Sequence, residues 1–344
     1  MSDERPGPDA WKDFVSKEPL LIELQALKQK GWSNPAGDTF FADRRQQAAR
    51  PSYKQKRLLY DMTKSIGENL VRATDILDTK NQTSDDTFRA LDLCMAPGGF
   101  SATVKNNIPN AHIDGITLPP KLGGYEVLAD RAFREIKHAD ITMYVSEMDV
   151  DANTYIPPSH PDREIFIHDR PFLVQQYNLI FCGGGVVRVH DREDYRKGCE
   201  GARLTLSQLV FALNRLKSGG SFVLLMHRVE ARESASLMYM ISRFAEIQAF
   251  KSPKAHGMTS SFYLVAKHVD TQSDAAVQAL DYWKAQWSYL TFREFAAIDE
   301  PVSGLKLSAE QLVAEFGTEF LGIARPIWKI QRDNLQRAPF TQSG

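Results

Sequence analysis

The chain has 344 residues, of which 43% are hydrophobic and 25% charged, and its formal net charge is −1. This composition is typical of a globular protein with one or two domains and excludes a wholly disordered chain. The charge also excludes a polycation that would bind any nucleic acid, so only a local basic patch could do so.

No stretch reaches the roughly 18 uninterrupted apolar residues that a membrane span needs. The charged start MSDERPGPDAWKDF lacks the apolar region of a secretory signal. Because Cys94, Cys182 and Cys199 have no CxxC spacing, we expect neither a disulfide framework nor a structural metal. These features predict an intracellular protein, cytoplasmic or nuclear, without a membrane partner, and they indicate no oligomeric state.

Residues 1–84 are predicted to form a helical extension. Apolar residues recur there at the spacing of an amphipathic helix, at Leu58, Leu59, Met62, Ile66, Leu70, Val71 and Leu77. Residues 44–72 also hold eight basic and two acidic side chains, with Tyr53 and Tyr60 among them. Basic groups interleaved with aromatic ones suit single-stranded RNA, and the alternative is a solvated charged helix face. The polar segment 81–86 predicts a linker or a helix end.

Residues 85–270 alternate short apolar runs with helical stretches, which predicts an α/β domain with a parallel sheet covered on both faces. We expect strands at 88–95, 111–117, 134–142, 177–182, 221–227, 244–250 and 260–267. A helix before the fifth strand should end at Ser218-Gly219-Gly220. The gap between the last two strands is too short for a helical crossover, so the final strand should run antiparallel to its neighbour.

Two further segments complete the chain. Residues 143–176, with four prolines and two histidines, predict a long surface excursion. Residues 271–344 predict a C-terminal helical extension. All five tryptophans lie outside 88–268, so we expect the flanking helices to pack on the sheet.

The first strand runs into Ala96-Pro97-Gly98-Gly99-Phe100, at the edge where open parallel sheets bind ligands. Adjacent glycines permit close approach to a ligand, and the following helix offers its positive end. The loop is neither GxGxxG nor GK[ST], which disfavours a dinucleotide or nucleoside-triphosphate site. Alone, it could also be an ordinary strand–helix turn.

Taken whole, LDLCMAPGGFS (91–101) resembles the S-adenosylmethionine-binding motif of the FtsJ-like (RrmJ-type) methyltransferases. YNLIFCGGG, LKSGGSFVLL and SSFYLVAK fit later landmarks of that family, so the resemblance covers residues 88–268. It implies S-adenosylmethionine as cofactor. It also implies a Rossmann-like methyltransferase sheet, mostly parallel with a terminal antiparallel hairpin and flanked by N- and C-terminal helices.

The resemblance also implies cofactor contacts. Asp92 would orient the loop or meet the methionine amino group, and the methionine would be lined by Ala96, Pro97, Gly98, Gly99 and Phe100. Thr117 stands where an acid usually holds the ribose. Asp140 aligns with the acid that reads the adenine amino group, or else is a solvated turn aspartate. Cys182 would form the pocket floor, with a thiol nucleophile as the alternative.

RrmJ-type enzymes methylate a ribose 2′-hydroxyl with a Lys-Asp-Lys-Glu set, and this chain lacks that set. Gly183-Gly184-Gly185 stands at the aspartate position, and Ser260-Ser261-Phe262 at the glutamate position. The remaining catalytic candidates are Lys64, preferred over Lys54 and Lys56, and His227 or Arg228 at the end of the fifth strand. Strand alternation should place only one of the last two in the site.

The leading hypothesis is an S-adenosylmethionine-dependent methyltransferase, with RNA ribose as acceptor by family resemblance and the basic stretch 44–72 as its RNA contact. The second is a cofactor-binding pseudoenzyme that acts as a partner or regulatory module. The third is a methyltransferase that acts on a small molecule or a protein. Fold alone does not decide among them.

Overall fold

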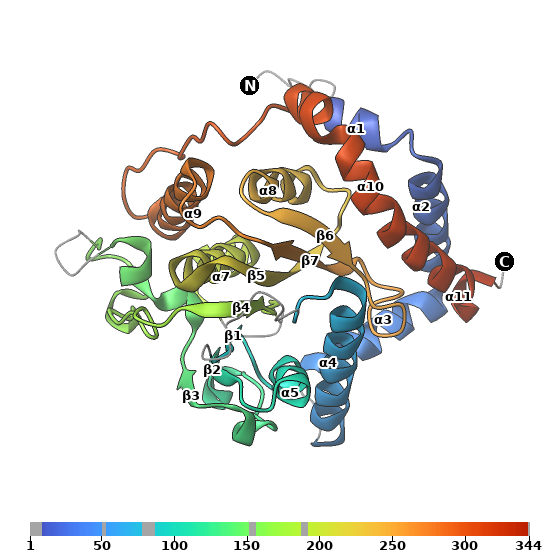
Figure 1. Ribbon diagram of the computed structural model, residues 1–344. Helices are drawn as coiled ribbons and strands as arrows, with labels where there is room; N and C mark the ends of the chain where they lie inside the picture. Colours follow the sequence, from blue (N-terminus) through green and yellow to red (C-terminus); the bar gives the residue numbers. More distant parts are fainter. Residues whose placement is uncertain (1–8, 50–52, 78–86, 151–155, 187–191, 343–344) are drawn as a thin grey trace.

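The computed structural model describes residues 9–49, 53–77, 87–150, 156–186 and 192–342. Seven strands form one sheet in the order β3-β2-β1-β4-β5-β7-β6 (Figure 1). They are β1 (Arg89–Leu93), β2 (His112–Thr117), β3 (Glu135–His138), β4 (Tyr177–Cys182), β5 (Leu216–His227), β6 (Glu246–Phe250) and β7 (Ser261–Lys267). The first five pair in parallel, and β7 runs antiparallel to both β5 and β6. The predicted mostly parallel sheet with a terminal antiparallel hairpin is confirmed.

Helices cover both faces of the sheet. α4 (Tyr53–Thr74) and α5 (Gly99–Asn107) lie on one face, and α7 (Glu200–Arg215), α8 (Arg232–Ser242) and α9 (Asp274–Phe292) on the other (Figure 1). The remaining helices are α1 (Ala10–Val15), α2 (Pro19–Trp32), α3 (Pro35–Ala49), α6 (Asp194–Lys197), α10 (Ala309–Gln336) and α11 (Pro339–Gln342). Within the described residues, the β2–β3 and β3–β4 connections contain only 3₁₀ turns in place of crossover helices.

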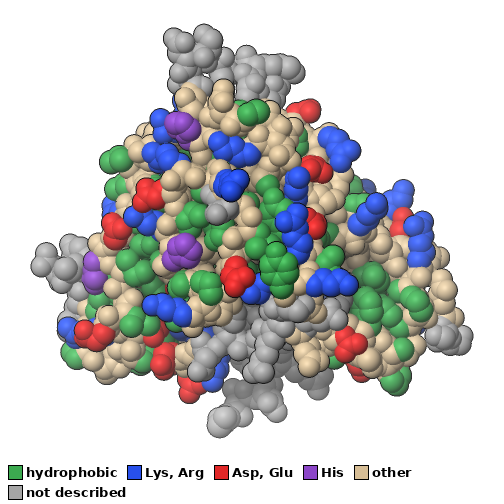
Figure 2. Space-filling model, turned by 90° about the horizontal axis from the view of Figure 1, so that it is seen from below, with side chains coloured by type: hydrophobic (Ala, Val, Ile, Leu, Met, Phe, Trp, Pro, Cys, Tyr) green, Lys and Arg blue, Asp and Glu red, His purple; other side chains and the backbone are tan. Residues whose placement is uncertain are grey.

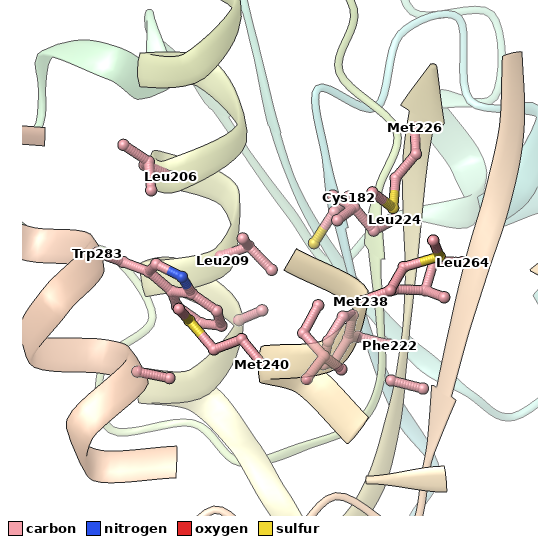
Figure 3. Close-up of a cluster of buried hydrophobic side chains, with 14 of the residues drawn as sticks. Cys182, Leu206, Leu209, Phe222, Leu224, Met226, Met238, Met240, Leu264 and Trp283 are labelled. Carbon is pink, nitrogen blue, oxygen red and sulfur yellow. The ribbon is translucent and has the colours of Figure 1, made fainter. Parts of the chain in front are cut away.

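Alternate residues of each strand enter two different cores, as the pleat requires. Leu91 and Leu93 of β1 pack with the core under α7, α8 and α9, whereas Ala90 packs with the core under α4 and α5. Figure 3 shows part of the first core, where Cys182 and Leu224 from the sheet lie near Leu209 of α7. The carboxyl ends of β1, β2, β3 and β4 therefore meet along one edge between the two helical layers.

The predicted end of α7, at Ser218-Gly219-Gly220, is wrong. The helix ends at Arg215, because Leu216 is already extended (φ −73°, ψ 131°) and pairs with Tyr177 of β4. Gly219, with φ +81°, lies within β5. The Ser218-Gly219-Gly220 sequence is therefore a turn inside the strand and not a helix cap.

The described parts of the segment 143–176, which are 143–150 and 156–176, are not the surface excursion that the prolines predicted. Several of their side chains are buried in the core under α7 and α9. Glu147 and Arg215 are both fully buried and form an ion pair, with Arg215 Nη1 3.1 Å from Glu147 Oε2. Arg215 Nε also donates to the Pro171 carbonyl at 2.8 Å. These bonds fasten the segment beneath the C-terminal end of α7.

The terminal helices pack against the domain, as the tryptophans predicted. Four of the five indoles are at most 1% exposed, at Trp11, Trp283, Trp287 and Trp328, whereas Trp32 is 62% exposed. None of the described helices is long and apolar enough to cross a membrane. The polar segment 81–86, with its boundary at 84, lies outside the described residues, and the three-part domain division stays a prediction.

Glu147→Ala should lower the free energy of unfolding by about 3–5 kcal/mol, because it leaves Arg215 buried without its counter-charge. Denaturant unfolding followed by circular dichroism measures this loss. The matched control is Asp194→Ala, which removes the exposed Lys197–Asp194 pair and should leave the free energy of unfolding nearly unchanged. A loss below 1 kcal/mol for Glu147→Ala would contradict the anchoring role of this pair.

Candidate functional site

The loop after β1 turns sharply into α5. Cys94 has a left-handed backbone (φ +60°), and Gly98, with φ +100°, precedes the first helical residue, Gly99. The Pro97 carbonyl accepts a hydrogen bond from Leu128 N at 3.1 Å. The loop is therefore held by the chain that follows β2 as well as by its own turn.

Packing against other parts of the protein explains both glycines. A Cβ on Gly99 would lie 2.1 Å from Thr63 Oγ1 and 2.5 Å from Lys64 N, both in α4. A Cβ on Gly98 would lie 2.9 Å from the Ala129 methyl group. Gly99 therefore sets how closely α4 approaches the loop, and Gly98 sets how closely the chain after β2 approaches it.

Asp92 is buried and serves the start of α5. Its carboxylate accepts hydrogen bonds from the Ser101 backbone and from Ser101 Oγ, the latter at 2.5 Å. Burial raises the pKa of Asp92 to about 7, although both Ser101 bonds act in the opposite direction. Since the side chain is 1% exposed, these contacts favour the loop-orienting role of the two considered for it.

An accessible strip runs along the carboxyl ends of β1, β3 and β4. Cys94 and Ala96 of the first loop, Asp140 after β3 and Gly184 after β4 are all partly exposed. A Cβ on Gly184 would lie 2.7 Å from Cys94 Sγ. Burial and then the nearby charges of Asp140 and Asp92 raise the pKa of Cys94, so its thiol stays protonated. The three strand ends therefore converge on one small area.

Asp140 is held from two sides. Its Oδ1 accepts from Thr142 N at 3.0 Å and Thr142 Oγ1 at 2.8 Å, and its Oδ2 accepts from Arg196 Nη2 at 2.7 Å. Burial alone would raise the pKa of Asp140, but Arg196 and the Thr142 bonds outweigh it and lower the pKa. The aspartate is therefore an oriented carboxylate that is ionised at neutral pH.

The other predicted cofactor residues are buried. Thr117 is 3% exposed, and the partly exposed residue at the end of β2 is Leu118. Phe100 stacks on Phe181 with ring centroids 5.0 Å apart. Cys182 lies within 3.7 Å of the Gln208 carbonyl, and burial raises its pKa, which argues against a thiol nucleophile.

A second polar group lies where β5 ends and β7 begins. His227 and Ser261 face each other in the register, and Ser261 Oγ lies 3.0 Å from His227 Nδ1. Partial burial and then the charge of Lys251 lower the pKa of His227, so the ring is neutral at pH 7. Arg228 follows with a left-handed backbone (φ +51°) and is exposed. Of His227 and Arg228, only His227 has a described side-chain partner on the sheet face that α4 and α5 cover.

Lys64 adjoins the first loop from α4. Its backbone nitrogen lies against Gly99, its carbonyl accepts from Thr103 Oγ1 at 3.1 Å, and its side chain is half-buried.

Among the described residues, no group of three or more His, Cys, Asp and Glu side chains could hold a metal ion.

Two sets of comparisons bear on this site. A sequence model of the FtsJ-like methyltransferase family matches residues 69–269, which is more than half of the chain. The chain belongs to the FtsJ-like methyltransferase family. Membership makes methyl transfer its reaction class and implies S-adenosylmethionine as methyl donor. No curated protein has a significant sequence match to this FtsJ-like chain.

Solved structures show only distant similarity. A putative ribosomal RNA methyltransferase from Plasmodium falciparum has 15% identity and a TM-score of 0.32, over 58% of this chain and 96% of that one. Human methyltransferase-like protein 13, in complex with SAH, has 12% identity and a TM-score of 0.36, over 68% and 95%. A TehB-like S-adenosylmethionine-dependent methyltransferase from Corynebacterium glutamicum has 14% identity and a TM-score of 0.32, over 68% of this chain and 99% of that one. Similarity at this level does not bear on the substrate.

The candidate site of this FtsJ-like methyltransferase contains residues that the sequence did not indicate. Arg196 pairs with Asp140, and Ser261 contacts His227. Lys251, 3% exposed, donates to the Thr259 and Ser261 carbonyls, both at 2.7 Å, and burial lowers its pKa to about 7. The one available signal was the position of Lys251 directly after an expected strand.

Asp92→Asn should make the protein progressively more stable than the wild type as pH rises from about 4 to 7. The pKa of Asp92 is raised in the folded state, so ionisation opposes folding across that window and the penalty persists above pH 7. Asn keeps an oxygen that can accept both Ser101 bonds. We expect a gain on the order of 2–4 kcal/mol at pH 8. Urea unfolding at pH 4 and pH 8 measures it, and a pH-independent difference would contradict it.

Proposed function

We propose that the chain binds S-adenosylmethionine along the ends of β1, β3 and β4 and transfers its methyl group to RNA. The observation that carries the cofactor site is the convergence of Cys94, Asp140 and Gly184 on one accessible area. An ionised carboxylate beside small residues fits an adenosine group, because adenine offers an amino donor and a flat ring.

Different residues of the candidate site would contact different parts of the cofactor. Asp140 would accept from the adenine amino group, and the partly exposed Gly183 and Gly184 would lie beside the ring. Partly exposed Cys94 and Ala96 would face the methionine part, and Asp92 would hold the loop in place. When bound, S-adenosylmethionine supplies an electrophilic methyl group.

The acceptor would approach at the neighbouring ends of β4 and β5. A ribose hydroxyl has a pKa far above 7 and requires a proton acceptor before it attacks. His227 is neutral at pH 7, and its Nδ1 contacts Ser261 Oγ. In the tautomer whose Nδ1–H donates to Ser261 Oγ, Nε2 is the nitrogen that could take a proton. The missing acidic residues make this a weaker arrangement than the Lys-Asp-Lys-Glu set.

The basic stretch 44–72 includes Lys64, which adjoins the first loop, and continues along α4 away from that loop. Tyr53 (73% exposed) and exposed Lys54 and Arg57 lie about 10–16 Å along α4 from Lys64, at 1.5 Å per residue. Viewed from below, Lys and Arg side chains lie beside a hydrophobic strip, with acidic side chains scattered among them (Figure 2). An exposed aromatic ring beside cations suits single-stranded RNA. The side chains of Arg44, Arg45 and Arg50 are outside the described residues.

One observation favours a second candidate, a cofactor-binding module without transferase activity. Glycines and Ser261 stand at the two acidic positions of the family set. Calorimetric titration with S-adenosylmethionine followed by tritium transfer to RNA, protein and metabolite pools distinguishes the two. Binding with transfer to RNA supports our proposal, transfer to another pool overturns the acceptor, and binding without transfer supports the second candidate.

His227→Ala should lower the rate of methyl transfer to RNA about a hundredfold, because it removes the proton acceptor. The wild-type rate should be constant above pH 6.5 and fall below it, since the pKa of His227 is lowered and only the neutral ring accepts a proton. Tritium transfer between pH 5 and 8.5 measures both. The neighbouring Arg228→Ala is the control with a smaller effect, and an unchanged rate in His227→Ala would refute this role.

Replacing Lys54 and Arg57 with Glu should weaken single-stranded RNA binding. The salt dependence of the binding constant should also become shallower by more than one unit of slope, because two cations leave the interface. Fluorescence anisotropy at several salt concentrations measures this. Replacing Lys12 and Lys17 with Glu is the matched control, because both side chains are exposed and lie outside residues 44–72. Equal losses in both variants would show a general charge effect and not a site.

A further inference from the structure

We infer that Arg196 is a positioning residue, which orients Asp140 to accept the adenine amino group of the cofactor. Arg196 belongs to the short helix α6, which follows the segment after β4 and contains no recognised motif. The inference rests on the proposed cofactor site and extends it to a residue that would not touch the cofactor.

The geometry leaves Asp140 little freedom. Thr142 occupies Oδ1 through its backbone and hydroxyl donors, and Arg196 Nη2 occupies Oδ2 at 2.7 Å. The aspartate side chain is nevertheless 21% exposed, whereas that of Arg196 is 9% exposed. Each carboxylate oxygen accepts more than one hydrogen bond, so the exposed edge still has acceptor capacity.

Arg196 is itself fixed by a carboxylate on α7. Its Nε donates to Glu200 Oε2 at 3.1 Å and its Nη2 to Glu200 Oε1 at 2.6 Å, which is a two-pronged contact. Glu200 also accepts from Arg203 at 2.9 Å, and Arg203 donates to Thr291 of α9 at 3.0 Å. The orientation of Asp140 is therefore fixed from α9 through a continuous series of buried contacts.

Arg196 also decides the charge of Asp140. The charged and titratable groups around Asp140 come from several elements. They are Arg196 and Tyr195 on α6, Arg192 just before it, Glu200 and Arg203 on α7, Asp162, which lies 3.6 Å from Arg196, and Cys94 and Asp92 on the β1 side. Without Arg196, burial among carboxylates would raise the pKa of Asp140. The side chain would then be ionised above this higher pKa and would lose its charge as the pH falls below it.

The experiment compares S-adenosylhomocysteine with S-inosylhomocysteine, in which a 6-oxo acceptor replaces the 6-amino donor. Calorimetry at several pH values from 5 to 8 gives the preference of each protein for the adenine ligand. The wild type should prefer it about tenfold to a hundredfold at all these pH values, the range of one charge-assisted hydrogen bond. Asp140→Asn should show a weak, pH-independent preference.

Arg196→Met should lose the preference as pH falls through the measured range, so its midpoint lies above that of the wild type, which keeps the preference throughout. Arg196→Lys keeps the charge without the planar fork and should show a smaller shift, which preserves the test if the methionine variant does not fold. Glu200→Gln is the matched control in the same network. Because it removes a negative charge beside Asp140, it should not move the midpoint upward.

The outcomes separate the two levels of the argument. A wild type that binds neither ligand would refute the proposed cofactor site itself. Wild-type binding with a preference that Asp140→Asn abolishes and the Arg196 variants keep at every pH would overturn the inference. An equal, pH-independent loss of both ligands in the Arg196 variants would show a structural role only and would also overturn it.

Discussion

The close approach of α4 to the loop after β1 constrains the whole candidate site. Gly99 has no room for a Cβ against Thr63, and Gly67 of α4 has none against Thr103 Oγ1, at 2.6 Å. Two glycines thus oppose two threonines across the α4–α5 contact. The threonine hydroxyls are satisfied by nearby carbonyls, so the contact stays polar without leaving those donors unpaired. The position of Lys64 and of the basic helix face follows from this contact.

The opposite face of the sheet is held by charge as well as by apolar packing. Glu147 with Arg215, and Glu200 with Arg196 and Arg203, lie at or near full burial. Buried ion pairs contribute little net stability compared with apolar residues of the same shape, but breaking one is costly. Their effect here is geometric, because they hold the segment after β3 and helix α9 in fixed positions relative to Asp140.

Much of the fold was predictable from local pattern. Most strands contain a short apolar run, and the short gap before β7 required a hairpin, so periodicity and connection length sufficed for them. The exception is β3, whose four residues include one apolar side chain, Ile136. The segment 143–176 misled because its prolines are typical of loops, while its buried groups depend on partners distant in sequence. The Ser218-Gly219-Gly220 end of α7 was also wrong. Gly-Gly suits a helix cap and a strand turn equally, and only the pairing with β4 decides between them.

The candidate site was predictable only in part. Strand ends predicted that Asp92, Asp140 and His227 lie at one edge of the sheet, because parallel strands end together. Their partners were not predictable: Arg196 contacts Asp140 across 56 residues, and Ser261 contacts His227 across 34. No local pattern encodes such a pairing. A pKa depends on these partners and on burial, so the charge states of the site became apparent only from the structure.

The strand order also bears on how the protein assembles during synthesis. Because β7 lies between β5 and β6, the strand made last is the one that completes the middle of this half of the sheet. Until residues 261–267 emerge from the ribosome, β5 has an unpaired edge and β6 has no neighbour. An exposed edge of this kind is prone to pair with other chains. The nascent protein is therefore most vulnerable to aggregation just before its last strand is translated.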